Sequence, residues 1–452
     1  MSLLLLSRIQ FTITIMFHYI YPPLSIGLGV IILIMETMYM ITKNPLYHQM
    51  TKFWVKIFGL NFAIGVATGI VMEFEFGTNW ATYSRYVGDV FGSALAAEGV
   101  FAFFLESGFL AILLFGWNKV SPFMHWVSAL LVCFGAHFSA IWIVVANSWM
   151  QTPAGYHIVG DGLHARAEIT DFWAMVFNPS SMERLAHVIS GAWIAGAFMV
   201  LSISAYYLLK KQHTEFAKAS MKVAIILAMI ACFGQLITGR IAAEAVAKWQ
   251  PTKLAAMEGH FAANAPANFY LFGLVDEKNH QVIGPHIKGF VSYLIHGDFK
   301  QPVKGLQSFK NADRPPVAAT FYTYHLMIII GIILMLITVT GIIFFWQGRL
   351  FEKVWYLRIL VPAVLLPQFA NQLGWIAAEV GRQPWIVYGL LRTSDGLSKA
   401  VQAGAVLTSL IMFTLIYLLL FVLFIFLLDR KIKHGPELIE AQIDGSTHRA
   451  SE

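Results

Sequence analysis

The chain has 452 residues, of which 58% are hydrophobic and only 12% are charged, whereas about a quarter of the residues of an ordinary soluble domain are charged. This composition excludes a soluble globular protein and indicates an integral membrane protein. The net charge of +6 comes from lysines and arginines in short connections between apolar runs, which membrane topology explains better than a nucleic-acid partner does. We expect no nucleic-acid partner.

Apolar runs long enough to cross about 30 Å of hydrocarbon, roughly 20 residues each, recur along the whole chain. The N-terminal stretch MSLLLLSRIQF lacks a basic segment and a small-residue cleavage site, so we expect it to lead into the first span without removal. Hydropathy predicts nine spans, at residues 11–41, 55–73, 92–116, 122–147, 184–209, 219–239, 317–346, 354–378 and 405–429. The first exceeds a perpendicular crossing, so we expect it to tilt or protrude. The predicted fold class is an all-α integral membrane bundle of about nine helices.

The connection at 240–316 is the one sizeable segment predicted to lie outside the membrane. Connections this long are usually functional or disordered, and its stretch PTKLAAMEGHF has helical spacing, which favours an ordered, functional loop. The predicted organisation is six helices within 1–239, this loop, three helices within 317–430, and a tail at 431–452.

Orientation follows from lysines and arginines in the short connections. Fifteen lie on one side of the predicted membrane and seven on the other, and the long loop carries the remaining nine. The side richer in positive charge faces the cytoplasm, so we predict an external N-terminus, an external 240–316 loop and a cytoplasmic C-terminus.

The chain has two cysteines, Cys133 and Cys232, each inside an apolar run. Neither belongs to a C-x-x-C-H motif, so any haem would be held non-covalently.

Titratable groups inside spans are costly and point to function. The candidates are His18, Glu98, Glu106, His137, His187, His325 and Glu379. The predicted topology places most of them, with Met327, in the outer half of the membrane, as expected for a cofactor layer. Glu106 is expected about 12 Å deeper than Glu98 and ~80° around the helix, where it could relay protons inward.

The ligand types suit haem iron. A methionine such as Met327 pairs with histidine at a low-spin haem, whereas a histidine or carboxylate alone leaves a coordination position open for a gas. Each residue also has a plainer interpretation. A single membrane histidine is more often a packing residue, Met327 alone says little, and Glu379 and Arg382 at i, i+3 could neutralise each other where the span meets water.

Four longer stretches are more specific: GWIAAEVGRQPW, GLNFAIGVATGIVMEFEFGTNW, EGVFAFFLES and ANSWMQTPAGY. They resemble subunit I of the cytochrome bd-type quinol oxidases, and the resemblance runs from about Ser7 to the end of the ninth span. It implies the haem-binding catalytic subunit of a terminal oxidase in the bacterial cytoplasmic membrane. Such an enzyme oxidises quinol at the outer face, reduces O2 to water, and generates a proton motive force by vectorial proton uptake without pumping.

The resemblance also implies cofactors, partners and residue roles. The cofactors are two haem b groups, one low-spin and one high-spin, and one haem d; the partners are a homologous second large subunit and a small single-span subunit. His187 and Met327 match the ligands of the low-spin haem, while His18 and Glu379 match those of the other two, without deciding which haem each holds. The remaining matches are Glu98 beside that pair, Glu106, Ser107 and Ser139 on a proton path, Arg382 at a haem propionate, and Lys253 and Glu258 at the quinol.

Two positions depart from the family pattern. His325 stands where an arginine is common; residues i and i+2 point ~200° apart on a helix, so His325 and Met327 cannot both face one iron, and we favour Met327. His137 stands where an amide is expected, either as a packing residue or as part of the proton path. The 240–316 loop lacks a long insertion, which places the chain in the short-loop subclass.

Three alternatives remain. A proton-translocating transporter would carry no chromophore, and a haem-copper oxidase would need a histidine cluster, whereas the 15 histidines here are scattered. A b-type quinol dehydrogenase without an oxygen site would leave His18, Glu98 and Glu379 without a role.

Overall fold

The structure is a computed structural model that describes residues 2–437, so residues 438–452 of the predicted tail lie outside the described residues. Within the described part, nine helical segments are long and apolar enough to cross a membrane, which confirms the predicted number and order. The helices are α1 (Leu3–His18), α2 (Tyr21–Thr42), α3 (Pro45–Gly77), α4 (Ala81–Tyr86), α5 (Gly88–Ala97), the π-helix η1 (Glu98–Phe103), α6 (Phe104–Phe115), α7 (Pro122–Gln151), α8 (Phe172–Val176), α9 (Ser181–Lys210), α10 (Thr214–Trp249), α11 (Pro251–Met257), α12 (Phe290–His296), α13 (Val317–Trp346), α14 (Val354–Ala363), α15 (Leu365–Val380) and α16 (Ala403–His434), with short 3-10 turns η2 (Gly162–His164), η3 (Leu306–Ser308) and η4 (Asn311–Asp313).

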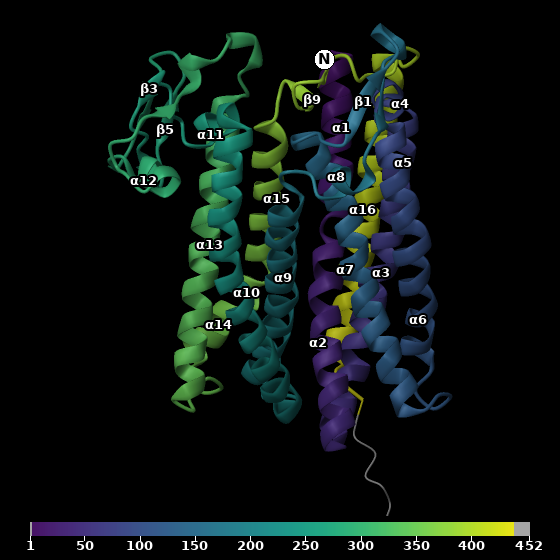
Figure 1. Cartoon of the computed structure of the whole chain (residues 1–452). Coiled ribbons are helices and arrows are strands. Elements are labelled where there is room, and N and C mark those ends of the chain that lie inside the picture. Colours follow the sequence, from purple (N-terminus) through teal and green to yellow (C-terminus); the bar gives the residue numbers. More distant parts are fainter. Residues whose placement is uncertain (1, 438–452) are drawn as a thin grey trace, which may run out of the picture.

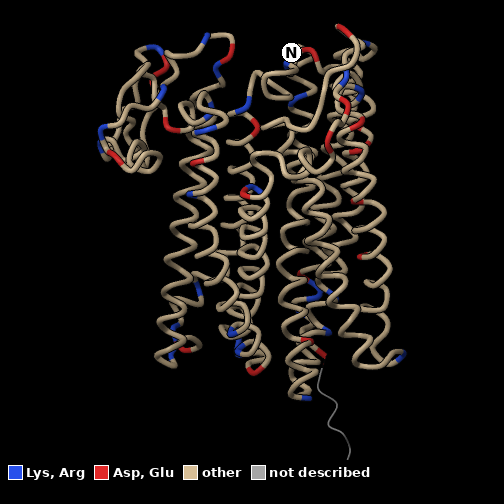
Figure 2. The backbone as a smooth tube through the Cα atoms, viewed as in Figure 1, with Lys and Arg blue, Asp and Glu red and all other residues tan. Residues whose placement is uncertain are grey.

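The long helices run side by side, and the N-terminus lies at the same end of the bundle as the strands (Figure 1). We call this end the loop end. Charged residues gather at the two ends and are sparse between them, as expected for a bundle whose middle faces hydrocarbon (Figure 2). The loop end is the one predicted to be external.

The strands are short and pair only locally. They are β1 (Tyr156–Val159), β2 (Arg166–Ile169), β3 (Asn264–Ala265), β4 (Phe269–Tyr270), β5 (Leu274–Asp276), β6 (Gln281–Ile283), β7 (His286–Ile287), β8 (Val303–Lys304), β9 (Trp385–Val387) and β10 (Leu391–Arg392). Each belongs to an antiparallel two-stranded sheet, such as β1 with β2, where Tyr156 pairs with Ile169. These strands brace the connections at the loop end.

The segment predicted as a long loop is ordered and partly helical. Helix α10 continues to Trp249, ten residues beyond the predicted end of its span, because its sequence keeps good helix formers such as alanine and lysine after residue 239. The stretch with helical spacing forms α11, and its alanines lie in a small core with Phe261 and Leu306. The segment is therefore a folded cap over the ends of α10 and α13.

The first apolar run is two helices, where the sequence suggested one helix that tilts or protrudes. Helix α1 ends at His18 and α2 begins at Tyr21, and Pro22 and Pro23 occupy the first turn of α2. Prolines have no N–H group, so they cannot continue the hydrogen-bond ladder of α1. The break places His18 at a helix end.

The third span contains the π-helix η1, which begins at Glu98. A π turn holds one more residue than an α turn, so it removes about 100° from the offset expected along a regular helix. Glu98 and Glu106 therefore lie within ~20° of one another around the axis, and not ~80° apart as the α-helical spacing predicted. Both acids face α7.

Helices α2 and α9 cross at two glycines. A Cβ atom on Gly196 would lie 2.4 Å from the carbonyl carbon of Gly27, and one on Gly27 would lie 2.4 Å from the backbone oxygen of Ala192. Small residues let the backbones of membrane helices approach closely and pack without side chains between them. This crossing fixes the most buried helix, α9, against the N-terminal half of the bundle.

We expect Gly196→Ala to destabilise the bundle by about 1–3 kcal/mol or more, because the new methyl group meets backbone that can move only if the helices separate. The control is Gly331→Ala on α13, where a Cβ atom would have no neighbour within 4 Å. Thermal unfolding of the purified complex measures both. Equal midpoints for the two variants would contradict the close crossing.

Candidate functional site

Glu379, near the end of α15, is the centre of a polar cluster at the loop end, and its own side chain is 32% exposed. Its Oε1 atom accepts hydrogen bonds from Asn147 Nδ2 at 3.2 Å and Gln151 Nε2 at 3.0 Å, and its Oε2 atom pairs with Arg382. Arg382 is only 4% exposed. The i, i+3 pair expected from the sequence is therefore formed, but its arginine lies inside the protein and not where the span meets water.

Two more cations reach this carboxylate through amides of α7. Arg184 of α9 donates from Nη2 to Asn147 Oδ1 at 2.5 Å, and Lys253 of α11 donates from Nζ to Gln151 Oε1 at 2.5 Å. Asn147 and Gln151 are one turn apart on α7, so each amide directs its NH2 group to Glu379 and its oxygen to a cation. Together with Arg382, three cationic side chains surround one carboxylate.

The guanidinium groups of this cluster keep N–H bonds without acceptors. Among the described residues, the buried Nε of Arg184 and the buried Nε and Nη1 of Arg382 have no hydrogen-bond partner. Positive charges outnumber carboxylates even when Glu183, next to Arg184 in the chain, is included. Unpaired buried donors cost about 1–3 kcal/mol each, and more when charged, so the cluster is suited to receive an anionic group.

Lys253 and Glu258, predicted at the quinol, are both buried but contact different neighbours. The stem of Lys253 packs against Gly381, where a Cβ atom would lie 2.9 Å from Lys253 Cγ. Glu258 Oε2 lies 3.9 Å from His325 Nε2. Burial lowers the pKa of Lys253 well below its ordinary value and raises the pKa of Glu258 to about 8, so the Glu258 carboxyl is mostly uncharged at neutral pH.

His18 and His187 share one local arrangement. The neighbours are Thr68 and Gly69 for His18, and Thr238 and Gly239 for His187. The Nδ1–Oγ1 distances are 3.0 Å and 3.1 Å, and a Cβ atom on the glycine would lie 3.2 Å and 3.5 Å from the ring Cε1 atom. In both places a threonine–glycine pair on a neighbouring helix supports an imidazole.

This arrangement decides which ring nitrogen carries the lone pair. Each threonine hydroxyl already donates to a backbone carbonyl four residues earlier, at 3.0 Å for Thr68 and 2.9 Å for Thr238. The hydroxyl oxygen must then accept from Nδ1–H, which leaves Nε2 as the atom with a lone pair. Nε2 of His187 is 2.9 Å from Gln235 Nε2, which can donate to it. Both histidines thus present the tautomer that can ligate iron through Nε2.

Met327 and His325 point to different helices, as the i, i+2 spacing predicts. Met327 Sδ lies 2.8 Å from the position of a Cβ atom on Gly374 of α15. The ring of His325 is stacked on Phe321 at 3.9 Å, donates from Nδ1 to the Phe321 carbonyl at 2.9 Å, and faces Glu258 of the loop segment. His325 therefore lies beside Glu258, although no hydrogen bond joins the two side chains.

The predicted proton-path residues lie at two depths along the third span, where η1 and α6 pack against α7. Ser139 Oγ donates to Glu98 Oε1 at 2.7 Å, so Ser139 belongs with Glu98. Glu106 is 6% exposed and packs against Gly135, where a Cβ atom would lie 3.0 Å from Glu106 Cβ. The Ser107 hydroxyl contacts only the Phe104 carbonyl of its own helix, at 3.5 Å, among hydrogen-bond partners in the described residues.

His137 lies between α7 and α9. Its Nδ1 donates to the Cys133 carbonyl at 2.7 Å, and its Nε2 accepts from Trp193 Nε1 at 2.9 Å. Both ring nitrogens are engaged, as they are in His187, so this geometry is compatible with packing and leaves both interpretations of His137 open.

Comparison with known proteins decides the family. The model of the cytochrome bd terminal oxidase subunit I family matches residues 6–436. The chain belongs to the cytochrome bd terminal oxidase subunit I family. The cytochrome bd ubiquinol oxidase subunit 1 of Bacillus subtilis is 41% identical over 448 residues, which are 97% of this chain and 95% of that protein. The cytochrome bd-II ubiquinol oxidase subunit 1 of Escherichia coli is 33% identical, over 97% of this chain and 98% of that protein.

A solved structure of the bd oxidase from Geobacillus thermodenitrificans has the same fold. Its TM-score is 0.88 at 29% identity, covering 96% of this chain and 99% of that one. The chain is therefore a membrane-integral subunit of a bacterial quinol oxidase. Members of the family use haem cofactors and function with a second subunit.

Sequence reasoning missed three residues of the Glu379 cluster in this subunit. Asn147 and Gln151 lie in the stretch ANSWMQTPAGY, where amides at i, i+4 at the end of an apolar span were the available signal. Arg184 was counted only as a topological charge. What joins these residues to Glu379 is the packing of α7 and α9 against α15, which no local pattern shows.

Two further buried acids of the subunit were also missed. Glu75 is 2% exposed and accepts from Thr14 Oγ1 at 2.8 Å. Glu36 lies 2.8 Å from His125 Nδ1, and His125 Nε2 is 3.2 Å from the Leu113 carbonyl. Their signal was the presence of a carboxylate within an apolar run.

We expect Gln151→Leu to destabilise the subunit by about 1–3 kcal/mol, because it leaves Lys253 with one fewer acceptor and Glu379 with one fewer donor in a buried place. The control is Gln402→Leu, an exposed glutamine that makes no capping hydrogen bond at the start of α16, with an expected change below about 0.5 kcal/mol. The thermal midpoint of the purified complex is the measurement. A shift no larger than that of the control would show that the bridge contributes nothing.

Proposed function

We propose that this chain holds two haem b groups and one haem d, oxidises quinol at the loop end and supports reduction of O2 to water. The observation that carries the proposal is the cluster of Arg184 and the buried Lys253 and Arg382 around Glu379. Its excess positive charge and its unpaired guanidinium N–H groups match the carboxylates of haem propionates, for which a planar guanidinium is the natural partner. The donor set therefore fits haem.

His187 and Met327 would hold the low-spin haem b, and His18 and Glu379 the high-spin haem b and haem d, in an order left open. His18, His187 and Met327 each pack against a glycine of a neighbouring helix. The glycine leaves room for the ligand side chain because it has no Cβ atom. Glu379 keeps one acceptor position for a metal beside its three present partners, because a carboxylate has about four such positions. Bound haem supplies electron transfer and the site of oxygen reduction.

The loop segment would position the quinol. Lys253 lies one amide from Glu379, and Glu258 lies beside His325, two residues before the proposed ligand Met327. A quinol held by these residues would lie near two of the proposed haem ligands, Glu379 and Met327. Because burial favours the uncharged carboxyl, Glu258 can take a quinol proton only after losing its own, which it can pass to the external side.

Protons consumed in forming water would come from the end opposite the loop, through Glu106 and then Glu98. Both acids face α7 because of the π turn, and Ser139 holds the outer one. Release at one end and uptake from the other would separate charge without a pump.

We expect the reduced-minus-oxidised spectrum of the purified enzyme to show b-type bands together with a chlorin band that shifts with carbon monoxide. His187→Ala should lose the low-spin b component, because the variant lacks one of the two side chains proposed to hold that haem. His137→Ala is the matched control, since it removes a hydrogen-bonded membrane histidine that is not among the proposed haem ligands. A His187→Ala enzyme with an unchanged low-spin spectrum would contradict the assignment, and the absence of a carbon monoxide-sensitive band would point to a quinol dehydrogenase.

We expect Glu106→Leu to slow oxygen reduction at least ~10-fold while leaving the haem spectrum intact, since proton transfer by a positioned side chain contributes ~10²–10⁴-fold. Glu106→Asp keeps a titratable group and should retain part of the rate. Oxygen consumption with a soluble quinol is the readout. Normal turnover in Glu106→Leu would remove the proton-path role.

The rate of quinol oxidation should rise with pH towards about 8, where the Glu258 carboxyl ionises and becomes able to accept a proton. Glu258→Gln should abolish this limb of the profile, and Glu244→Gln, which changes a surface acid paired with Arg240, should keep it.

Ionisation of Glu258 should have the opposite effect on the stability of the fold, which it lowers. The pKa is raised above its ordinary 4.5, so ionisation costs stability, which falls between about pH 4.5 and 8 in the native protein but not in Glu258→Gln.

A further inference from the structure

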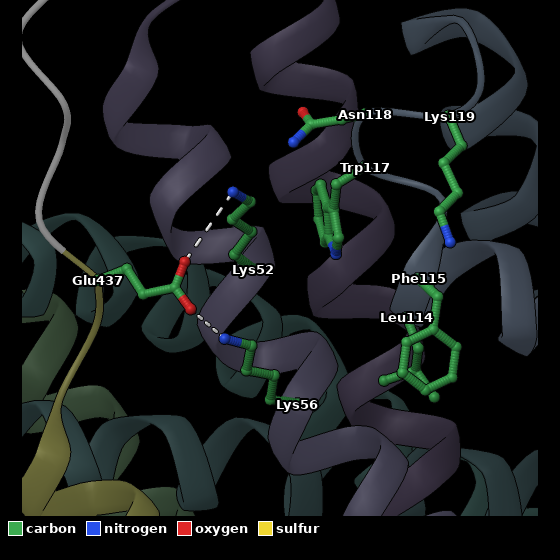
Figure 3. A pocket seen from close by; sticks show the side chains of 8 residues that line it. All are labelled: Lys52, Lys56, Leu114, Phe115, Trp117, Asn118, Lys119 and Glu437. Atoms are coloured by element: carbon green, nitrogen blue, oxygen red, sulfur yellow. Dashed lines mark hydrogen bonds and ion pairs between the residues drawn. The ribbon is translucent and has the colours of Figure 1, made fainter.

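A small pocket lies at the end of the bundle opposite the loop end (Figure 3). It is formed by the first half of α3, the end of α6 and the α6–α7 connection, and the segment after α16 closes one side. Its volume is about 290 Å³. Its polar wall contains Lys52, Lys56, Lys119 and Glu437, and we call it the lysine pocket.

The lysine pocket carries more positive than negative charge. Three lysines line it, and Glu437 is the one carboxylate among its described lining residues. Lys52 and Lys56 are one helical turn apart, where like charges repel. Glu437 lies between them, with one oxygen 3.9 Å from Lys52 Nζ and the other paired with Lys56. The pocket is thus built to hold an anion, and a carboxylate from the far end of the chain shows where that anion sits.

The other wall of the lysine pocket is apolar. Phe115 is 69% exposed at the end of a membrane span, and the Trp117 ring lies 5.6 Å from Lys52 Nζ. Tryptophan is enriched where membrane meets water, and an exposed phenylalanine beside it belongs to the hydrocarbon edge. A ligand that fits the lysine pocket therefore has an anionic group for the lysines and, close to it, an apolar group for Phe115 and Trp117.

We propose that the lysine pocket binds the phosphate headgroup of an anionic phospholipid, in exchange with the Glu437 carboxylate. Basic pockets between spans on the cytoplasmic side bind such headgroups, and this end carries the excess of lysines and arginines. The phosphate would replace the carboxylate between Lys52 and Lys56, and an acyl chain would run along Phe115. The exchange is feasible because the Glu437 side chain is 47% exposed, and ion pairs at such sites contribute little.

The test uses the assembled enzyme, delipidated in detergent, with phosphatidylglycerol as the probe and native mass spectrometry as the readout. Lys52→Gln/Lys56→Gln should weaken the tightest phosphatidylglycerol site ~30-fold, the size expected for two lysines at an anionic surface. Glu437→Gln should strengthen it several-fold, because the internal competitor is neutral. Lys210→Gln/Lys211→Gln is the control, since it removes the same charge at the end of α9 without touching the pocket. Intact haem spectra establish that all variants are folded.

Three results would overturn the proposal. Equal loss of lipid in the two double variants would mean that general surface charge attracts the lipid. Displacement of the lipid by millimolar glycerol phosphate would mean that the pocket recognises a soluble phosphate. Equal retention of phosphatidylcholine and phosphatidylglycerol by the native enzyme would mean that no anionic headgroup is selected, as when the partner subunit covers the pocket.

Discussion

Charge inside an apolar bundle must be balanced by the protein itself, and this constraint organises the loop end. Glu379 would be prohibitively costly alone, and three cations with two amides surround it. The cations in turn exceed the carboxylates, so the cluster is balanced only when a further anionic group is present. The residues that stabilise the carboxylate would, in the proposed function, also receive haem propionates.

Two irregularities in the helices bring polar side chains to where this balance is needed. The break before Pro22 and Pro23 ends α1 at His18, and the π turn brings Glu98 and Glu106 onto one face towards α7. In a membrane each irregularity exposes backbone groups that neighbouring helices must satisfy or cover. Each irregularity costs stability, and such costs are tolerated at functional sites. One lies beside a proposed haem ligand and the other on the proposed proton path.

The two ends of the bundle differ in a way that suits vectorial chemistry. The loop end carries a folded cap whose buried lysine and acid have shifted pKa values, and the opposite end carries lysines and the lysine pocket. Between the ends, Glu98 of η1 and the buried Glu106 of α6 both lie against α7. This asymmetry would allow proton release and proton uptake to occur on different sides while electrons move within one end.

The sequence by itself determined the fold class, the nine spans, the family and the residue types able to ligate haem, because these depend on local hydropathy and on long motifs. It also determined that His325 and Met327 diverge, since the helix geometry alone requires it. Only the tertiary structure decided that Arg382 is buried, that Ser139 partners Glu98, that Arg184 and Lys253 converge on Glu379, and that the two acids of the third span share a face. These outcomes depend on the packing of helices far apart in the chain and on one extra residue in a turn, and no local periodicity records either.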